Sequence, residues 1–169
     1  SLVERAGRLD STGASQTILP IIYAPAGDIT GYLPTNVMSM TDGQWVLDMK
    51  VFKELMRPAI NTGLSVTRVG GVAQNKRQKA LAAALNKTLA GYRVADEYAH
   101  FGGELSPESR ADYEKGKLLF QLMSQEIGET YSLMDQQFML DIVLNAKYEE
   151  VVDLPKLKSI VKEYSARVQ

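Results

Sequence analysis

Arg68 is the residue in this sequence whose type and position most clearly suggest chemistry. It lies in a short β-branched run, residues 64–69, and Gly70 and Gly71 follow this run directly. An arginine near the end of a strand, beside glycines that let the backbone turn sharply, can project its permanently charged guanidinium group away from the chain. Arg68 is therefore a candidate contact for a phosphate or another anion. An ion pair with a nearby acidic residue is the alternative, and the local residues leave both interpretations open.

Motifs for self-contained catalysis are absent from the sequence. It has no Walker-type phosphate loop, no Gly-x-Ser-x-Gly elbow, no Gly-x-Gly-x-x-Gly fingerprint and no His-Glu-x-x-His zinc motif. It has no cysteine, which excludes disulfides, thiol nucleophiles and cysteine-ligated metals. The single histidine, His100, has no second histidine or clustered acids at ligand spacing, so we expect it to be structural and expect no metal site. We therefore expect this chain alone to be inactive as an enzyme.

Composition and charge narrow the possible partners. The chain contains 19 Lys and Arg against 20 Asp and Glu, a formal net charge of −1. This balance gives no general electrostatic reason for binding nucleic acid or an anionic membrane, so any anion contact must be local. No apolar run approaches the roughly 18 residues of a membrane helix, so we expect membrane association only through partners. Residues 2–8 favour a helix without a preceding cap, and we expect the chain to begin inside a domain.

The elements that must position Arg68 lie in a first half, residues 1–74, rich in Gly, Pro, Thr and Asn. Three short apolar runs predict strands there, namely residues 17–23, which we expect to be buried, residues 44–47, and residues 64–69. The pair Asp42-Gly43 predicts a tight turn before the second strand, because such a pair readily supplies a positive φ. This half is predicted to be mixed α/β.

Four helices are predicted in the second half, residues 75–169, because apolar residues recur there at intervals of three and four. The first runs through an alanine-rich stretch. Ser106 begins the second, in N-cap position before a proline, and Gly128 ends it. Ser132 begins the third with capping-box spacing, and Asp153 begins the fourth. The second half is therefore predicted to be an all-α bundle.

Two blocks of sequence carry a family resemblance. Residues 34–44 (Pro-Thr-Asn-Val-Met-Ser-Met-Thr-Asp-Gly-Gln) and residues 57–74, which begin Arg-Pro-Ala-Ile-Asn and contain Ser-Val-Thr-Arg-Val-Gly-Gly, closely resemble the alpha subunits of F-type ATP synthases, in spacing as well. The resemblance covers most of residues 1–125. It implies that residues 1–74 are the C-terminal part of a RecA-like P-loop NTPase nucleotide-binding domain, lacking the P-loop, and that residues 75–169 are a truncated C-terminal helical domain.

The resemblance also implies a function. In this family alpha and beta subunits alternate in a hexameric ring, with a central stalk gamma subunit and a peripheral stalk that includes delta. The chain would be a regulatory, noncatalytic alpha subunit for ATP synthesis or hydrolysis coupled to proton transport. ATP or ADP with Mg2+ would bind in the intact complex. This chain alone would hold neither the nucleotide nor the metal ion. A bacterial subunit would lie at the cytoplasmic face of the inner membrane, attached indirectly through the ion-conducting sector.

Family positions assign roles to six residues. Arg68 matches the alpha arginine that reaches into the neighbouring beta subunit's catalytic site as an arginine finger. Ser39 and Gly43 match positions close to the same phosphate region, although Ser39 can equally be a cap or turn residue. The adenine pocket of alpha's own noncatalytic site has two walls in this family; the residues that match them are Arg57 and Pro58 on one wall and Gln125 on the other.

Some segments depart from the family pattern. Residues 23–28 look partly like the beta subunit, residues 126–130 hold a short insertion beside the adenine-contact segment, and the match is loose past about residue 135. An alpha-like subunit of a divergent F1-like ATPase that does not synthesise ATP therefore stays open as an alternative. A flagellar or type III secretion ATPase shares the opening segment but lacks the two blocks in this form. A non-enzymatic helical interaction module is the alternative from a different class.

Overall fold

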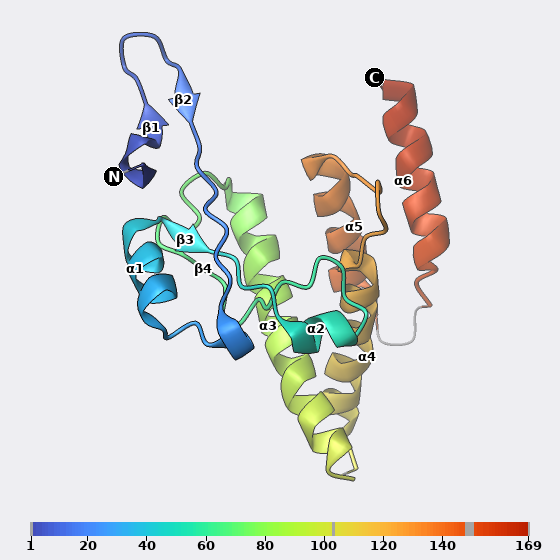
Figure 1. Cartoon of the computed structure of the whole chain (residues 1–169). Coiled ribbons are helices and arrows are strands. Elements are labelled where there is room, and N and C mark those ends of the chain that lie inside the picture. Colours follow the sequence, from blue (N-terminus) through green and yellow to red (C-terminus); the bar gives the residue numbers. More distant parts are fainter. Residues whose placement is uncertain (1, 103, 148–150, 169) are drawn as a thin grey trace. The chain divides into compact units, whose positions relative to one another are not determined.

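The computed structural model describes residues 2–102, 104–147 and 151–168 (Figure 1). The chain divides into two compact units. Unit 1 comprises Ser1–Lys53 and Ala59–Gly70, and unit 2 comprises Glu54–Pro58 and Gly71–Gln169. The short segment Glu54–Pro58 thus belongs to the helical unit, although the chain on both sides of it belongs to unit 1. Nothing in the sequence pattern indicated this interruption.

Unit 1 consists of short elements joined by turns. In chain order the described elements are η1 (Val3–Arg5), β1 (Gly7–Arg8), β2 (Ser15–Gln16), η2 (Pro25–Gly27), α1 (Tyr32–Met40), β3 (Gly43–Gln44), α2 (Met49–Lys53) and β4 (Val66–Thr67). Strands β1 and β2 pair antiparallel, and so do β3 and β4, with Gly43 opposite Thr67. An isolated antiparallel bridge between Leu47 and Ile60 lies next to the second pair. The predicted strands at 44–47 and 64–69 are therefore confirmed in part, as shorter strands that pair with each other.

Three local predictions for unit 1 are wrong. Residues 17–23 form no strand, and Ile21 is 98% exposed, because the described part of unit 1 offers this segment no neighbouring strand to pair with. Residues 2–8 form only the 3₁₀ turn η1 and then enter β1, since a β-hairpin competes with the helix there. Gly43 has no positive φ and lies within β3, so the Asp42-Gly43 pair does not make the predicted tight turn.

Unit 2 contains the four predicted helices, drawn green to red in Figure 1: α3 (Lys76–His100), α4 (Pro107–Met123), α5 (Leu133–Asn145) and α6 (Leu154–Val168). Their starts follow local hydrogen-bonding rules. The Ser106 hydroxyl accepts from the backbone N–H of Ser109 at 3.2 Å, and Ser132 makes a full capping box. Helix α4 ends at Met123, earlier than predicted, because Gly128, with φ of 82°, belongs to a separate turn in the α4–α5 loop.

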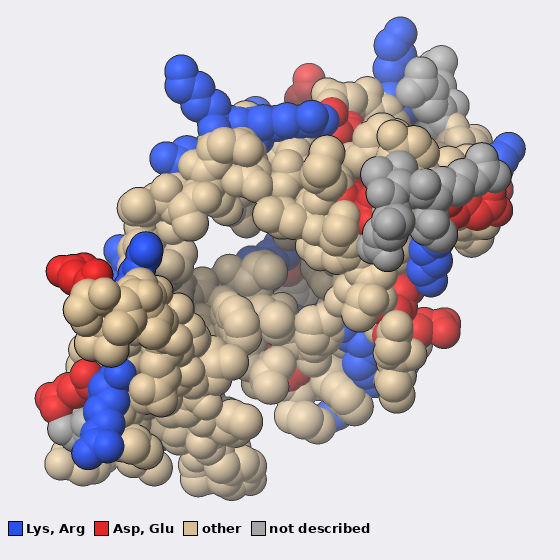
Figure 2. Space-filling view, turned by 90° about the horizontal axis from the view of Figure 1, so that it is seen from above, with Lys and Arg blue, Asp and Glu red and all other residues tan. Residues whose placement is uncertain are grey.

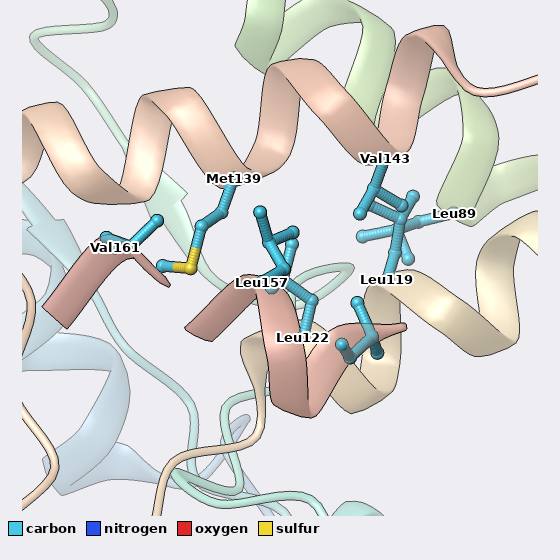
Figure 3. Close-up of a cluster of buried hydrophobic side chains, with 8 residues drawn as sticks. Leu89, Leu119, Leu122, Met139, Val143, Leu157 and Val161 are labelled. Atoms are coloured by element: carbon cyan, nitrogen blue, oxygen red, sulfur yellow. The ribbon is translucent and has the colours of Figure 1, made fainter. Parts of the chain in front are cut away.

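The core of unit 2 is a cluster of apolar side chains from all four helices, which point toward one another in Figure 3. Its buried members are Leu89, Leu119, Leu122, Met139, Val143, Leu154, Leu157 and Val161. Leu119 and Val143 have no exposed surface. Burying such a side chain is worth roughly 1.5–3 kcal/mol relative to leaving it in water, so this cluster is the main source of the unit's stability. The prediction of an apolar face on the first helix is confirmed, since Leu89 is buried and Leu85 packs against the cluster.

Helices α3 and α4 approach closely at a glycine. A Cβ atom added to Gly116 would overlap the side chain of Tyr92, which lies across α4 at this point. The Tyr92 ring stacks on Tyr113, with centroids 5.4 Å apart, and contacts Phe120 at 5.0 Å. The absence of a side chain at Gly116 therefore allows an aromatic cluster to join the two helices.

Candidate functional site

The six candidate residues fall into two groups, one in each unit. Ser39, Gly43 and Arg68 lie in unit 1, and Arg57, Pro58 and Gln125 lie in unit 2. Each group is brought together from segments that are separate in the sequence.

The guanidinium group of Arg68 binds the C-terminal end of α1. Nη1 donates to the carbonyl oxygen of Ser39 at 3.2 Å, and Nη2 donates to that of Met38 at 2.9 Å. These carbonyls belong to the last turn of the helix, where backbone acceptors lack helical partners and carry the negative end of the helix dipole. The backbone N–H of Arg68 donates to the carbonyl of Asp42 at 2.7 Å, which fixes the start of the side chain. Arg68 is therefore oriented by backbone carbonyls at one edge.

The rest of the Arg68 side chain stays available. The residue is exposed, and no described carboxylate forms an ion pair with it. A guanidinium group carries five N–H donors in a planar fork, and the two contacts with α1 use one hydrogen on each terminal nitrogen. Among the described residues the Arg68 guanidinium thus contacts helix-end carbonyls and no carboxylate, and it keeps N–H donors that these two contacts do not use. This arrangement can receive an anion such as a phosphoryl group.

Gly43 permits the strand contact that sets the position of Arg68. A Cβ atom at Gly43 would lie 2.5 Å from the carbonyl oxygen of Val66 and 3.0 Å from the Cα of Thr67. Real side chains do not approach a backbone so closely, so only glycine allows β3 and β4 to pair at this distance. Since Arg68 follows β4 directly, this close pairing is what places it beside the end of α1.

Ser39 contributes its carbonyl group to Arg68, and its hydroxyl is engaged elsewhere. The Ser39 Oγ donates to the carbonyl of Asn36 within α1 at 2.6 Å. Such a bond to the preceding turn is common for serine in a helix and satisfies the hydroxyl locally. The Ser39 hydroxyl is thus engaged within its own helix, and the expected place of Ser39 near a phosphate stays a prediction.

The second group is held together by the loop that follows α4. The backbone N–H of Gln125 donates to the carbonyl of Arg57 at 2.8 Å, and the Arg57–Pro58 peptide bond is cis. Nη1 of Arg57 donates to the carbonyl of Met56 at 2.9 Å, and the Gln125 side-chain amide donates to the carbonyl of Glu129 at 3.4 Å. The two predicted adenine walls are thus adjacent through a backbone hydrogen bond. This contact, with the bond from the Ser124 hydroxyl to the Leu55 carbonyl at 3.5 Å, links Glu54–Pro58 to the rest of unit 2.

Sequence reasoning missed a charged cluster in the same loop. The Tyr131 hydroxyl donates to Oε1 of Glu129, and Lys158 and Lys162 of α6 each approach the Glu129 carboxylate at 3.4 Å. The Tyr131 hydrogen bond, the N–H of Glu126 and the Lys158 charge together lower the pKa of Glu129 from 4.5 to about 2, although burial opposes this. Burial and the same hydrogen bond raise the pKa of Tyr131. Only the insertion at 126–130 signalled that this loop is unusual.

The distribution of charged side chains on the surface is consistent with the expectation that any anion contact is local. On the face seen in Figure 2, Lys and Arg side chains are scattered among acidic and uncharged ones and gather into no single basic patch. No group of three or more His, Cys, Asp or Glu side chains that could hold a metal ion occurs among the described residues. In the same part of the chain no helix is both long and apolar enough to cross a membrane.

Two family models match the chain. Residues 1–67 match the nucleotide-binding domain of the ATP synthase alpha/beta family, and residues 74–169 match the C terminal domain of the ATP synthase alpha/beta chain. The matched regions fit a nucleotide-binding α/β part followed by the helical unit seen in the structure.

Individual relatives are similar over nearly the whole chain. ATP synthase subunit alpha of Acholeplasma laidlawii is 40% identical over 164 residues, which are 96% of this chain and 32% of that protein. The subunits of the same name from Clostridium acetobutylicum and Anaplasma marginale are each 44% identical, over 94% and 91% of this chain and 32% and 30% of those proteins. The chain thus spans about a third of the length of the relatives it matches. On these matches the chain belongs to the ATP synthase alpha/beta family, in which its relatives are alpha subunits.

Proposed function

We propose that the chain acts within the noncatalytic, regulatory alpha subunit of an F1-type ATP synthase, and that Arg68 supplies an arginine finger to the catalytic site of a neighbouring beta subunit. One observation carries this proposal. The Arg68 guanidinium is exposed, has no described carboxylate partner, and is oriented along one edge by the carbonyls of Met38 and Ser39. A salt-bridging arginine would instead be neutralised by an acid.

The proposed role of Arg68 is to stabilise charge in phosphoryl transfer. Negative charge is spread over the γ-phosphoryl oxygens in the transition state, and a planar, permanently charged guanidinium can bind two of these oxygens at once. An arginine finger is typically worth about 10³ to 10⁵ in rate, or about 4 to 7 kcal/mol. The two helix-end carbonyls would hold the group in orientation before the substrate arrives, so that little conformational entropy is lost on contact.

The second group would bind the base of a nucleotide. In this proposal Arg57 and Pro58 line one side of the adenine in the subunit's own noncatalytic site, and Gln125 lines the other, for ATP or ADP. The support is the hydrogen bond from the Gln125 N–H to the Arg57 carbonyl, which keeps the two segments adjacent. Mg2+ would accompany the nucleotide, but we assign its ligands to none of the described residues, because no suitable cluster of acidic or histidine side chains occurs among them.

The assembly would be the F1 ring. We propose beta subunits as the neighbours, with a central stalk gamma subunit and a peripheral stalk that includes delta, in a complex that couples ATP synthesis or hydrolysis to proton transport. The subunit would be peripheral, at the cytoplasmic face of a bacterial inner membrane, and would meet the membrane only through the ion-conducting sector. The names of the relatives support this assignment, since each is called ATP synthase subunit alpha.

Substituting Arg68 in the assembled ring tests the proposal. Arg68→Lys keeps a positive charge but loses the planar fork, and we expect it to lower the maximal ATP hydrolysis rate at least about 10²-fold, with the ring assembled and ATP still bound. Arg77→Lys is the matched control, because Arg77 is an exposed arginine whose ion pair with Asp141 is a surface contact. A near wild-type rate for Arg68→Lys and Arg68→Ala would overturn the finger role and favour a non-enzymatic interaction module.

A further inference from the structure

The α4–α5 loop contains a turn that closes on itself. The backbone N–H of Glu129 donates to the carbonyl of Glu126 at 3.0 Å, and the N–H of Glu126 donates back to Oε2 of Glu129 at 3.1 Å. Gly128, with φ of 82°, occupies a position in this turn where glycine is strongly favoured. The segment that departs from the family pattern therefore forms a turn that one backbone bond and the Glu129 carboxylate both close.

The same carboxylate connects the loop to helix α6. Lys158 lies 3.4 Å from Oε2 of Glu129, and its ammonium group also donates to the carbonyl of Ser124 at 3.1 Å. One lysine thus contacts both ends of the segment that contains Gln125. The Lys158 side chain is 19% exposed and that of Glu129 is 11% exposed, whereas Lys162 is 54% exposed. Because screening weakens exposed pairs, the Glu129–Lys158 contact is the stronger of the two.

The loop in turn holds the proposed adenine contacts. The Gln125 side-chain amide donates to the carbonyl of Glu129 at 3.4 Å, and the Gln125 backbone donates to the carbonyl of Arg57 at 2.8 Å. Glu129 is therefore hydrogen-bonded directly to Gln125, and it is linked through Gln125 to the Arg57–Pro58 segment. All these residues belong to unit 2.

We propose that Glu129 and Lys158 form a positioning pair, which holds Gln125 against the Arg57–Pro58 segment and thereby sets the affinity of the noncatalytic site for adenine nucleotides. This inference rests on the proposed adenine role of Gln125. Neither member of the pair is itself proposed to contact the base. Removing the Glu129 charge leaves the partly buried Lys158 without its carboxylate, and removing the Lys158 charge leaves Glu129 with the exposed Lys162 as its remaining cation. In either case the loop relaxes toward solvent and the amide of Gln125 loses its orientation.

The test uses 2-azido-ATP as a photoaffinity probe on the assembled ring. Labelling of the peptide that carries Gln125 reports occupancy beside the loop, and competition by ATP or GTP gives the affinity and the base preference of that site. We expect Glu129→Gln and Lys158→Gln each to raise the ATP concentration for half-maximal competition about tenfold. The double variant should lose no more than either single variant, because the pair acts as one unit. GTP competition should change less than about twofold, since the loss concerns contacts to adenine.

Three further variants separate the possible results. Lys156→Gln, an exposed lysine on the same helix, should leave ATP competition unchanged, and Glu129→Asp should restore part of the affinity that Glu129→Gln loses. If Gln125→Ala weakens ATP competition while Glu129→Gln and Lys158→Gln do not, the positioning pair is overturned and the adenine wall stands. If Gln125→Ala has no effect either, the proposed adenine contact of Gln125 is wrong, and the proposed role of the Glu129–Lys158 pair is wrong with it.

Discussion

Nη2 of Arg68 donates to the carbonyl oxygen of Met38 at 2.9 Å across a sequence separation of 30 residues. The contact joins the end of a helix to the residue after a strand, and it depends on β3 and β4 lying close together between them. The orientation of the proposed finger is therefore a property of the α1–β3–β4 segment as a whole.

Gly43→Ala tests this dependence. The added methyl group would meet the carbonyl of Val66, so we expect β3 and β4 to separate, with a loss of about 1–3 kcal/mol in the free energy of unfolding and displacement of Arg68. Urea unfolding and the ATP hydrolysis rate of the assembled ring measure the two effects. Gly7→Ala is the matched control, because a Cβ at Gly7 meets no atom within 4 Å. Equal stability of the two variants would contradict the close approach at Gly43.

Gly116→Ala tests the contact between α3 and α4. The new methyl group would overlap Tyr92, and we expect overpacking to lower the free energy of unfolding by about 1–3 kcal/mol. Gly91→Ala in α3 is the control. Its Cβ would meet the carboxylate of Asp112 at 2.7 Å, the end of an exposed side chain that can rotate away, while alanine favours the helix by up to about 1 kcal/mol. Thermal unfolding compares the two variants with the parent protein. A Gly116→Ala variant that is more stable than the parent protein would refute the packing argument.

The lowered pKa of Glu129 predicts that the free energy of unfolding depends on pH in the acid range. Its folded pKa, about 2, is below the ordinary 4.5, so its ionised form stabilises the folded state above about pH 4.5, and this contribution is lost as the pH falls toward 2. The free energy of unfolding of Glu129→Gln should therefore lie below that of the parent protein at pH 6. The difference should shrink as the pH falls from 4.5 to 2. Denaturant titrations across this range measure it, and a difference independent of pH would mean that the pKa of Glu129 is not lowered.

Local chemistry explains which parts of the fold the sequence predicts well. Helices α4 and α5 begin where Ser106 and Ser132 indicate, because an N-cap needs only residues within one turn. The segment at 17–23 has the composition of a strand but forms none, because a strand requires a partner that its own residues do not specify. Gly43 could be recognised as a residue with a special role. The reason why glycine is required at this position is a close approach to the backbone of Val66, which lies on a strand farther along the chain.

The candidate site shows the same division. The position of Arg68 beside a glycine pair marks it as a candidate from sequence, yet its contacts with Met38 and Ser39 depend on tertiary structure. The role of Arg68 in catalysis stays a prediction, as do those of the other five residues. The Glu129–Lys158 contact could not be predicted, since it joins a loop to a helix whose register against that loop is set by core packing.

The chain passes between the two units three times, at residues 53–54, 58–59 and 70–71. The helical unit is consequently a discontinuous module, and a recombinant protein that starts at Gly71 would lack the Arg57 carbonyl to which the Gln125 N–H donates. Dissection of this protein into independently expressed pieces must therefore carry Glu54–Pro58 with the helices, for example by circular permutation, if the native loop conformation is to survive.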